Sequence, residues 1–595
     1  MSPPRAQEPL LENDRDAVKS PRTNIAGMRV IPTPATSAWL ANFHKRNGRA
    51  PAVLHIGNIA NAAYLNASMM NALGLDCDLL CYDYYHIMGC PEWESAAFDS
   101  TQITDQAQPK WSEIDLNGFE RPRWFAQGSL GSCLDYLIAR RTPGADANAL
   151  WERLALEREG AQLDGDSDGE IVSQVDLRAR RSALVVAFAA DFPLRRDQLH
   201  EDELIGHFAL VDRYFARLQH VLSLYDVVVG YSTDGILPLA VGKRPYISYE
   251  HGTIRALPFE DNTAGRLCAL TYSRADITII TNCDAVTAAE KLNILDYRFV
   301  PHPINENVPT QAHLAGLRQE LRERLGTDFI IFHPSRQHWG PERHPSWEKG
   351  NDIFLKGFAR FVKEDSPAAA AVLVDWGVTA DASKSLLADL GIADRVIWVS
   401  PQNASGMASY IQATEVLADQ FFLGAWGSTM PRALYFGTPA MLYVNEKVHE
   451  WCFSEMPPIV NVRTSEEVHK GLRSLLDVEH RHEVVRRARR WYDKYHSNQI
   501  VADGLVEAVK DALKRDEPSQ TAALARDVRD IRQAQITELA LLKEHRSGEE
   551  SLTVQMLLRI PPMVPHIERV HRLVRAVFGP PVRAARRLHR RVSAR

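Results

Sequence analysis

The feature of the sequence that most constrains the fold is a repeated alternation of short apolar runs with longer helical stretches. Residues 52–56 form an apolar run, residues 60–73 carry apolar side chains at helical spacing, and residues 78–82 form a second run. Gly74 marks the end of the helical stretch. A strand, a helix and a second strand in this order form a βαβ unit, which implies a parallel sheet covered by helices on both faces.

The alternation continues along most of the chain in two series. Short apolar runs of the first series lie at residues 226–230, 245–249, 276–280 and 297–300, and those of the second at 328–332, 371–374, 396–399, 415–418 and 439–443. Pro301 and Pro303 separate the two series, because a proline biases the preceding residue toward an extended conformation. A chain of 595 residues also exceeds what one core usually serves. We therefore predict an α/β fold with two Rossmann-like domains.

This pattern suggests five segments along the chain. We expect a flexible leader at 1–31, a first Rossmann-like domain at 32–310, an insertion within it near 91–169, a second Rossmann-like domain at 311–500, and a helical, basic C-terminal extension at 501–595. The leader is rich in proline and charged residues and lacks apolar periodicity, which is typical of a flexible segment.

The C-terminal extension has an unusual charge pattern. Residues 551–595 contain ten arginines and one acidic residue, and residues 567–578 place apolar side chains along one helical side. A basic amphipathic helix of this kind suits an anionic membrane surface. A solvated arm or a helix docked on a partner chain is the alternative.

The remaining composition points to a cytoplasmic protein that does not bind nucleic acid. The net charge of −6 gives no reason to expect nucleic acid as a partner. Seven cysteines are scattered without metal-ligand spacing, which favours reduced thiols that fill the core. No apolar run approaches the ~20 residues that cross a bilayer, and the first residues lack a signal-peptide core. We expect a cytoplasmic location, with peripheral contact to the inner face of the membrane.

Two positively charged residues follow the first strand of the second series. Arg336 comes directly after residues 328–332, and Lys349 precedes Gly350 at the start of the next helical stretch. Parallel sheets bind ligands beyond the carboxyl ends of their strands. Two cations there could hold the diphosphate of a sugar nucleotide and stabilise it as a leaving group. Two ordinary surface cations are the alternative.

A glycine-bearing loop follows a later strand of the same series. Gly424, Trp426 and Gly427 lead into Ser428 and Thr429 at a helix start. Free backbone N–H groups at a helix start attract phosphate or sugar oxygens, and glycines allow the backbone to approach a ligand closely. The helix then ends in a Gly-Thr-Pro sequence at 437–439. Together with the two cations, this loop predicts a donor pocket.

Residues of about 325–500 resemble the C-terminal domain of the retaining GT-B glycosyltransferases, in particular family four with its glycogen-synthase-like fold. The resemblance rests on Arg336, on Lys349 with Gly350, and on the glycine-rich loop with its Gly-x-Pro helix end. It implies two facing Rossmann-like domains, a nucleotide-diphosphate sugar as co-substrate, no metal or other cofactor, and transfer with retention of anomeric configuration.

The first half resembles the same enzymes more loosely. Gly57, Asn58 and Asn61 form a loop after the first strand, where the resemblance implies contact with donor phosphate and acceptor. His251 follows the strand at 245–249, and the resemblance makes it the candidate catalytic histidine near the donor sugar. A structural histidine is the alternative.

The second half departs from the family at two positions. The family carries two glutamates about eight positions apart, which contact the donor sugar and the nucleotide ribose, and the matching residues here are Gly424 and Arg432. Arg432 cannot accept a hydrogen bond from a ribose hydroxyl, although it could pair with a phosphate or an acidic sugar.

The leading hypothesis is therefore a glycosyltransferase that moves a sugar from a nucleotide-diphosphate donor to a polysaccharide or lipid-linked glycan. Two alternatives stay open. One is a nucleotide-sugar epimerase, which would need carboxylates for acid–base chemistry. The other is a binding or scaffold protein that descends from a glycosyltransferase and has lost catalysis.

Overall fold

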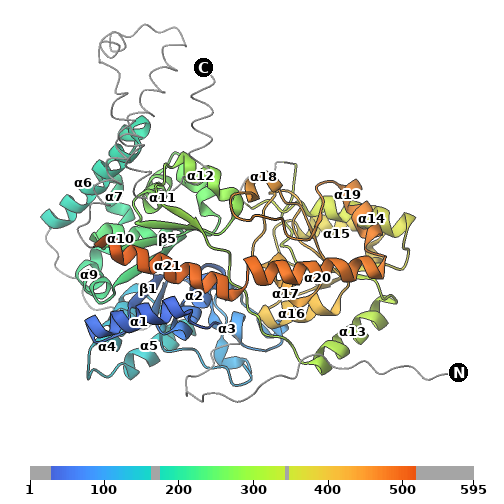
Figure 1. The fold of residues 1–595 in the computed structure, drawn as a ribbon, viewed down its shortest axis with the longest axis horizontal. Helices are drawn as coiled ribbons and strands as arrows, with labels where there is room; N and C mark the ends of the chain where they lie inside the picture. Colours follow the sequence, from blue (N-terminus) through green and yellow to red (C-terminus); the bar gives the residue numbers. More distant parts are fainter. Residues whose placement is uncertain (1–28, 162–173, 342–346, 517–595) are drawn as a thin grey trace, which may run out of the picture. The chain divides into compact units, whose positions relative to one another are not determined.

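The first half of the chain forms a parallel sheet of seven strands. The structure, a computed structural model, describes residues 29–161, 174–341 and 347–516 (Figure 1). The strands are β1 (Ala52–Ile56), β2 (Asp76–Tyr82), β3 (Phe125–Gly128), β4 (Val227–Tyr231), β5 (Tyr246–Tyr249), β6 (Ile277–Ile280) and β7 (Tyr297–Phe299), in the order β3-β2-β1-β4-β5-β6-β7. The chain leaves β1 toward β2 and returns through β4 on the other side of β1, so the strand order reverses between β1 and β4.

The second half forms a parallel sheet of six strands. These are β8 (Ile330–His333), β9 (Ala370–Val374), β10 (Val396–Val399), β11 (Val416–Ala418), β12 (Ala440–Leu442) and β13 (Val460–Asn461), in the order β10-β9-β8-β11-β12-β13. Here the order reverses between β8 and β11. Both sheets are parallel throughout, which confirms the predicted α/β class with two Rossmann-like units, the pair that a GT-B fold comprises.

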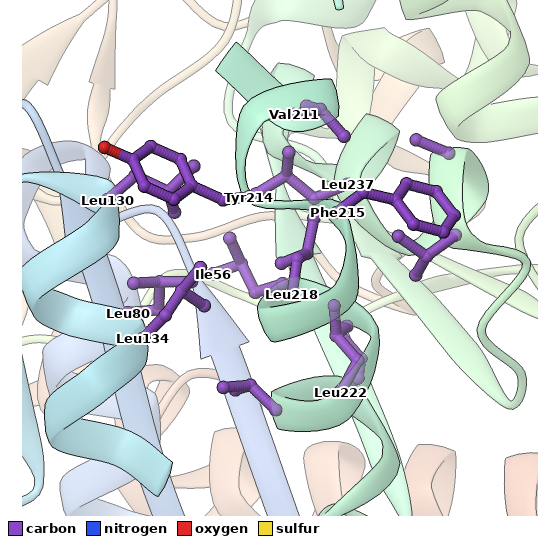
Figure 2. Close-up of a cluster of buried hydrophobic side chains, with 14 of the residues drawn as sticks. Ile56, Leu80, Leu130, Leu134, Val211, Tyr214, Phe215, Leu218, Leu222 and Leu237 are labelled. Atoms are coloured by element: carbon purple, nitrogen blue, oxygen red, sulfur yellow. The ribbon is translucent and has the colours of Figure 1, made fainter. Parts of the chain in front are cut away.

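Helices cover both faces of the first sheet. They are α1 (Pro34–Asn47), α2 (Ala62–Leu73), α3 (Pro91–Ser95), α4 (Leu130–Arg141), α5 (Asn148–Arg158), α6 (Gln174–Asp191), α7 (Glu201–His207), α8 (Ala209–Arg213), α9 (Phe215–Ser223), α10 (Ile236–Val241), α11 (Thr263–Ser273) and α12 (Val286–Lys291). On one face, Ile56 of β1 and Leu80 of β2 share a buried cluster with Leu134 of α4 and Leu218 of α9 (Figure 2). Burial of each such side chain contributes about 1.5–3 kcal/mol.

The stretch at 91–169 is not wholly an insertion. It contains β3, which pairs with β2 at the edge of the first sheet, and α4, which packs against β3. The strand was missed because its four residues include the polar Gln127 and a glycine. Gln127 is nevertheless fully buried, and its amide donates a hydrogen bond of 2.7 Å to the carbonyl of Tyr84. The carbonyl of Tyr84 thus takes the place of water as the hydrogen-bond partner of Gln127, the one polar side chain of β3.

The second half has its own helices, and the last described helix returns to the first. The helices are α13 (Gln311–Leu325), α14 (Asn351–Glu364), α15 (Ala380–Asp389), α16 (Ala404–Ala413), α17 (Thr429–Phe436), α18 (Glu446–His449), α19 (Ser465–Ser474), α20 (Val478–Tyr495) and α21 (Asn498–Asp516). Val501, Leu505 and Val509 of α21 share a buried cluster with Val53 of β1, and α21 runs beside α2 (Figure 1).

The predicted boundary between residues 500 and 501 therefore falls inside α21, a helix that covers the first sheet. Leader residues 1–28 and the basic segment 567–578 lie outside the described residues. Among the helices that the structure describes, none is long and apolar enough to cross a membrane.

Candidate functional site

Arg336 and Lys349 lie beyond the carboxyl end of β8, next to the point where the second sheet reverses its strand order. Lys349 directly precedes Gly350, which begins α14 with a left-handed φ of 67°. The Lys349 Nζ donates a hydrogen bond of 2.7 Å to Oε1 of Gln420, which follows β11. Lys349 thus bridges the carboxyl ends of β8 and β11, where ligands bind in sheets of this kind.

Lys349 is positioned among further charged groups. Burial lowers its pKa to about 8, although the charge of Asp419 acts in the opposite direction. Asp419 follows β11 and accepts a hydrogen bond of 2.6 Å from Ser335 Oγ, and burial raises its pKa. The Lys349 ammonium and the Asp419 carboxyl thus both have pKa values shifted by burial. Pairs of ionisable groups with shifted pKa values are typical of functional sites.

The guanidinium of Arg336 makes no ion pair with any residue that the structure describes. It lies 5.6 Å from the ring centre of Trp376, and burial lowers its pKa. An arginine that has given up solvation without gaining a carboxylate partner is suited to a ligand that brings negative charge.

Arg255 is a third cation in this region, and no motif in the sequence predicted it. It lies in the loop after β5 and forms two hydrogen bonds with Asp284, of 2.6 and 2.8 Å. The charges of Arg255 and Arg336 both lower the pKa of Lys349. A loop of the first half therefore lies close enough to act on a lysine of the second half. The only sequence signal was its place four residues after His251.

His251 lies in the same loop after β5 and is neutral at physiological pH. Burial and the charge of Arg255 lower its pKa to about 4. Its Nδ1 is buried without a hydrogen-bond partner among the residues that the structure describes, and its ring meets that of His302 edge-on at 4.8 Å between centres. A neutral imidazole with an unoccupied nitrogen can orient a ligand group, but it carries no charge for that purpose.

The glycine-rich loop excludes a side chain at one of its glycines and leaves space at another. Gly424 has φ of 73°, and a Cβ there would lie 2.9 Å from the ring of Tyr443 and 3.0 Å from Asn445 Cβ. A glutamate could therefore not replace Gly424 without rearrangement of the loop. A Cβ on Gly427 would meet nothing within 4 Å, so the backbone there is open to a ligand.

Ser428 and Thr429 begin α17, but Ser428 does not cap the helix as its position suggested. Its φ and ψ of −77° and −9° are helical, and its side chain accepts no capping hydrogen bond. Within the described residues, no N-cap side chain therefore satisfies the first backbone N–H groups of α17.

Trp426 lies in the core of the second half and does not line a donor pocket. The side chain is only 4% exposed, and its ring stacks on His449 with 4.4 Å between centres. The sequence suggested ligand contact because the residue lies between two glycines, but a large apolar ring in this loop gains more from burial.

Arg432 is buried, and its charge is already paired. Its Nη2 lies 3.0 Å from Oε1 of Glu94 on α3, while its Nη1 has no hydrogen-bond partner in the described part of the chain. Asn305, between the two sheets, donates a hydrogen bond to the carbonyl of Glu94. The expected pairing of Arg432 with a phosphate or an acidic sugar is thus replaced by a protein carboxylate from the first half.

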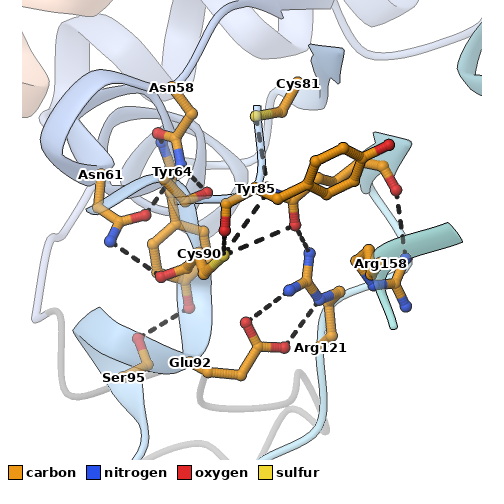
Figure 3. Close-up of polar contacts among 12 residues, drawn as sticks. Asn58, Asn61, Tyr64, Cys81, Tyr85, Cys90, Glu92, Ser95, Arg121 and Arg158 are labelled. Carbon is orange, nitrogen blue, oxygen red and sulfur yellow. Dashed lines mark hydrogen bonds and ion pairs between the residues drawn. The ribbon is translucent and has the colours of Figure 1, made fainter. Parts of the chain in front are cut away.

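Asn58 and Asn61 hold the first loop in place and do not present their amides to a ligand. Both are buried, and Nδ2 of Asn58 donates to Oδ1 of Asn61 at 2.8 Å and to the carbonyl of Gly89 at 2.9 Å (Figure 3). Nδ2 of Asn61 donates to the carbonyl of Cys90 at 2.9 Å. The third residue of this loop, Gly57, has φ of 85° and lies against Asp234.

The chain has distant similarities to solved structures. No family model matches it, and no curated protein matches it. HepE from Anabaena, solved with UDP and glucose, is 15% identical over 51% of this chain and 83% of its own, with a TM-score of 0.42. Sucrose-phosphate synthase from Thermosynechococcus elongatus is 11% identical over 78% and 100%, with a TM-score of 0.45. WaaG, a glycosyltransferase involved in lipopolysaccharide biosynthesis, is 10% identical over 77% and 99%, with a TM-score of 0.42. The fold class is established by the two parallel sheets. Similarities this distant add no argument for it.

Proposed function

We propose that the chain is a glycosyltransferase that moves a sugar from a nucleotide-diphosphate donor to a polysaccharide or lipid-linked glycan, with retention of configuration. The observation that carries the proposal is the position of Lys349 and Arg336 at the reversal point between β8 and β11, with Arg255 near enough to act on Lys349. Cations at this place suit a diphosphate, whose negative charge grows as the glycosidic bond breaks.

Two further features support a donor site there. The start of α14 follows Lys349 directly, and the start of α17 lacks a side-chain cap. Helix N-termini favour anionic ligands, because their free N–H groups and dipoles point toward the ligand. The open backbone at Gly427 leaves space for the ligand to approach the start of α17.

A donor screen tests the proposal. Purified protein is titrated with UDP-, GDP-, ADP- and TDP-sugars and then incubated with each donor and a membrane-lipid extract, with mass spectrometry to detect glycosylated product. NMR of the product anomeric centre tests retention. We expect Arg336→Ala and Lys349→Ala each to weaken donor binding about 10- to 100-fold, the range for hydrogen bonds to charged groups.

Lys356→Ala is the matched control, because Lys356 lies on α14 with its side chain 49% exposed and pairs with Asp352 on the same helix. Unchanged donor binding in the Arg336→Ala and Lys349→Ala double variant would contradict the proposed diphosphate site.

A nucleotide-sugar epimerase is the second candidate, because the region contains two buried carboxylates. Burial raises the pKa values of Glu250 and Asp419. Glu250, however, accepts hydrogen bonds from Thr281 and Asn282, which fix the loop after β5. The same screen without acceptor separates the candidates: an epimerase converts the donor sugar alone, and a scaffold that has lost catalysis binds donor without product.

A further inference from the structure

Asp234 lies beyond the carboxyl end of β4, at the point where the first sheet reverses its strand order. Ligands of open parallel sheets bind outside the strand ends at such a point. In the second sheet the equivalent point holds Lys349 and Asp419, the proposed donor site. The equivalent point in the first sheet lies between β1 and β4, next to the loop that contains Gly57.

The carboxylate of Asp234 is held in place by its neighbours. The phenol of Tyr82, at the end of β2, donates a hydrogen bond of 2.9 Å to Oδ1. Gly57 follows β1, and a Cβ there would lie 2.1 Å from Oδ2 of Asp234. Only glycine leaves room for the carboxylate, and its φ of 85° also favours glycine. Three neighbouring strand ends thus shape the position of one side chain.

One oxygen of this carboxylate is available. Within the described part of the chain, Oδ2 of Asp234 accepts no hydrogen bond, and the residue is partly exposed to solvent. A carboxylate oxygen has two acceptor positions. Removing it partly from water without supplying a hydrogen-bond donor is unfavourable in free energy. The site therefore favours a ligand that supplies a donor.

Backbone strain gathers at the same edge of the sheet. Ala60 and Asn61 after β1, Asp83 after β2 and Ser232 after β4 all have φ between 48° and 55°. Asn and Asp adopt this conformation readily, but Ala60 and Ser232 do so at a cost, and such strained positions cluster at ligand sites. This observation is independent of Asp234 and points to the same place.

We propose that Asp234 binds a hydroxyl of the acceptor glycan through Oδ2, at the reversal point between β1 and β4. The inference rests on the proposed function, because it names the acceptor side of the same reaction. A carboxylate repels phosphate but forms short, strong hydrogen bonds with hydroxyl donors. The ligand is accordingly a neutral, hydroxyl-rich group and not a second nucleotide.

The ionisation of Asp234 gives the proposal a pH signature. Burial raises its pKa to about 6, and the hydrogen bond from Tyr82 acts in the opposite direction. Above that pH the carboxylate is charged and binds a hydroxyl more strongly than the protonated form does. Glycan affinity should therefore rise as pH increases through about 6, and Tyr82→Phe should move this rise to higher pH.

The test uses the full chain with octyl glucoside, octyl galactoside and octyl mannoside as acceptor probes, below their micelle concentrations. NMR titration at pH 5 and pH 7.5 compares the wild type with Asp234→Asn and Tyr82→Phe. We expect the wild type to bind at least one probe and Asp234→Asn to lose at least about 10-fold in affinity at pH 7.5. UDP, GDP and ADP are titrated in parallel to report on the donor site.

Asp226→Asn is the matched control, because Asp226 lies at the opposite end of β4 and pairs with Arg49 at 2.5 Å. This variant should keep the affinity and pH profile of the wild type. Failure of every glycoside to bind, or equal binding by Asp234→Asn, would overturn the inference. If a nucleotide still binds, only the acceptor site fails; if none binds, the proposed function fails with it.

Discussion

Glu94 on α3 and Arg432 on α17 form an ion pair of 3.0 Å in which neither side chain is more than 9% exposed. The two residues come from the two halves of the chain, and each half contributes one charge from a helix. Burial raises the pKa of Glu94, and the charge of Arg432 opposes that rise. The pair therefore depends on both halves being in place, and it occupies a position where the family resemblance implied a ligand contact.

We expect Glu94→Gln to lower the free energy of unfolding by about 3–5 kcal/mol, because it leaves the guanidinium buried without a counter-charge. Glu94→Leu combined with Arg432→Met should recover most of this loss, since a packed apolar pair needs no counter-charge. Urea unfolding measures the change. Glu455→Gln breaks the exposed pair with Lys494 and should leave stability unaltered. An equal loss of unfolding free energy in Glu94→Gln and Glu455→Gln would show that the buried pair contributes no more to stability than the exposed pair.

The pKa of Lys349 predicts a pH limit for donor binding. As pH rises through about 8, the ammonium loses its proton and the diphosphate loses one counter-charge, so affinity should fall. Lys349→Arg should remove this fall, because arginine stays protonated throughout. Calorimetric titration with the nucleoside diphosphate that the screen identifies, between pH 7 and pH 9.5, measures both. An identical pH profile in the two proteins would contradict the prediction.

The same shift has a defined effect on stability. The folded-state pKa lies below the ordinary value of 10.5, so between about pH 8 and 10.5 the unfolded chain binds more protons than the folded chain. Stability from this residue should therefore rise with pH across that window. Lys349→Met should flatten the rise in urea midpoints measured at constant ionic strength.

Gln420 is expected to position Lys349. Its Oε1 accepts from the lysine at 2.7 Å, and its Nε2 donates to the carbonyl of Ala425 in the glycine-rich loop. Gln420→Leu should weaken donor binding about 10-fold, because it releases both groups. Gln420→Glu should instead raise the pKa of Lys349 and move the pH limit of binding above 8. A purely structural role would lower stability in both variants without moving that limit.

Apolar patterning predicted the strands well, because a buried parallel strand needs an unbroken apolar run. Residues 52–56 coincide with β1 at both ends, whereas β3 was missed because it includes Gln127. The site was harder to predict. Arg336 follows β8 closely and Lys349 precedes α14, so their place could be read from the order of elements. Asp234 and Arg255 act through contacts with residues distant in sequence, and no local pattern marks them.

The candidate site residues whose side chains make internal contacts show the same limit. Trp426, Asn58 and Asn61 have the right chemistry for a ligand, but the fold uses that chemistry internally. Whether a polar or aromatic side chain faces a ligand or its own chain depends on which groups the fold brings beside it. Sequence spacing along one element does not contain that information.

Cys283 and Cys452 are far apart in the sequence, but the fold brings their thiols together. Cys283 follows β6 and Cys452 follows α18, and the indole N–H of Trp451 donates a hydrogen bond of 2.9 Å to the carbonyl of Cys283. Burial raises the pKa of the Cys283 thiol, but hydrogen bonds from Cys452 and His449 outweigh this effect and bring it to about 7. Nδ1 of His449 donates to the carbonyl of Asn445 at 2.8 Å, and within the described residues its buried Nε2 has no geometric hydrogen-bond partner.

We expect this pair to form a disulfide under mild oxidation by diamide, since the thiolate is the reactive form. Peptide mass spectrometry should find Cys283 linked to Cys452, and His449→Phe should slow the reaction. Cys81 and Cys90 serve as the internal control. Both contact Gln127, but burial raises the pKa of each thiol, so they should stay reduced. Linkage of Cys81 to Cys90 at the same rate would mean that proximity alone, without the histidine, decides which thiols react.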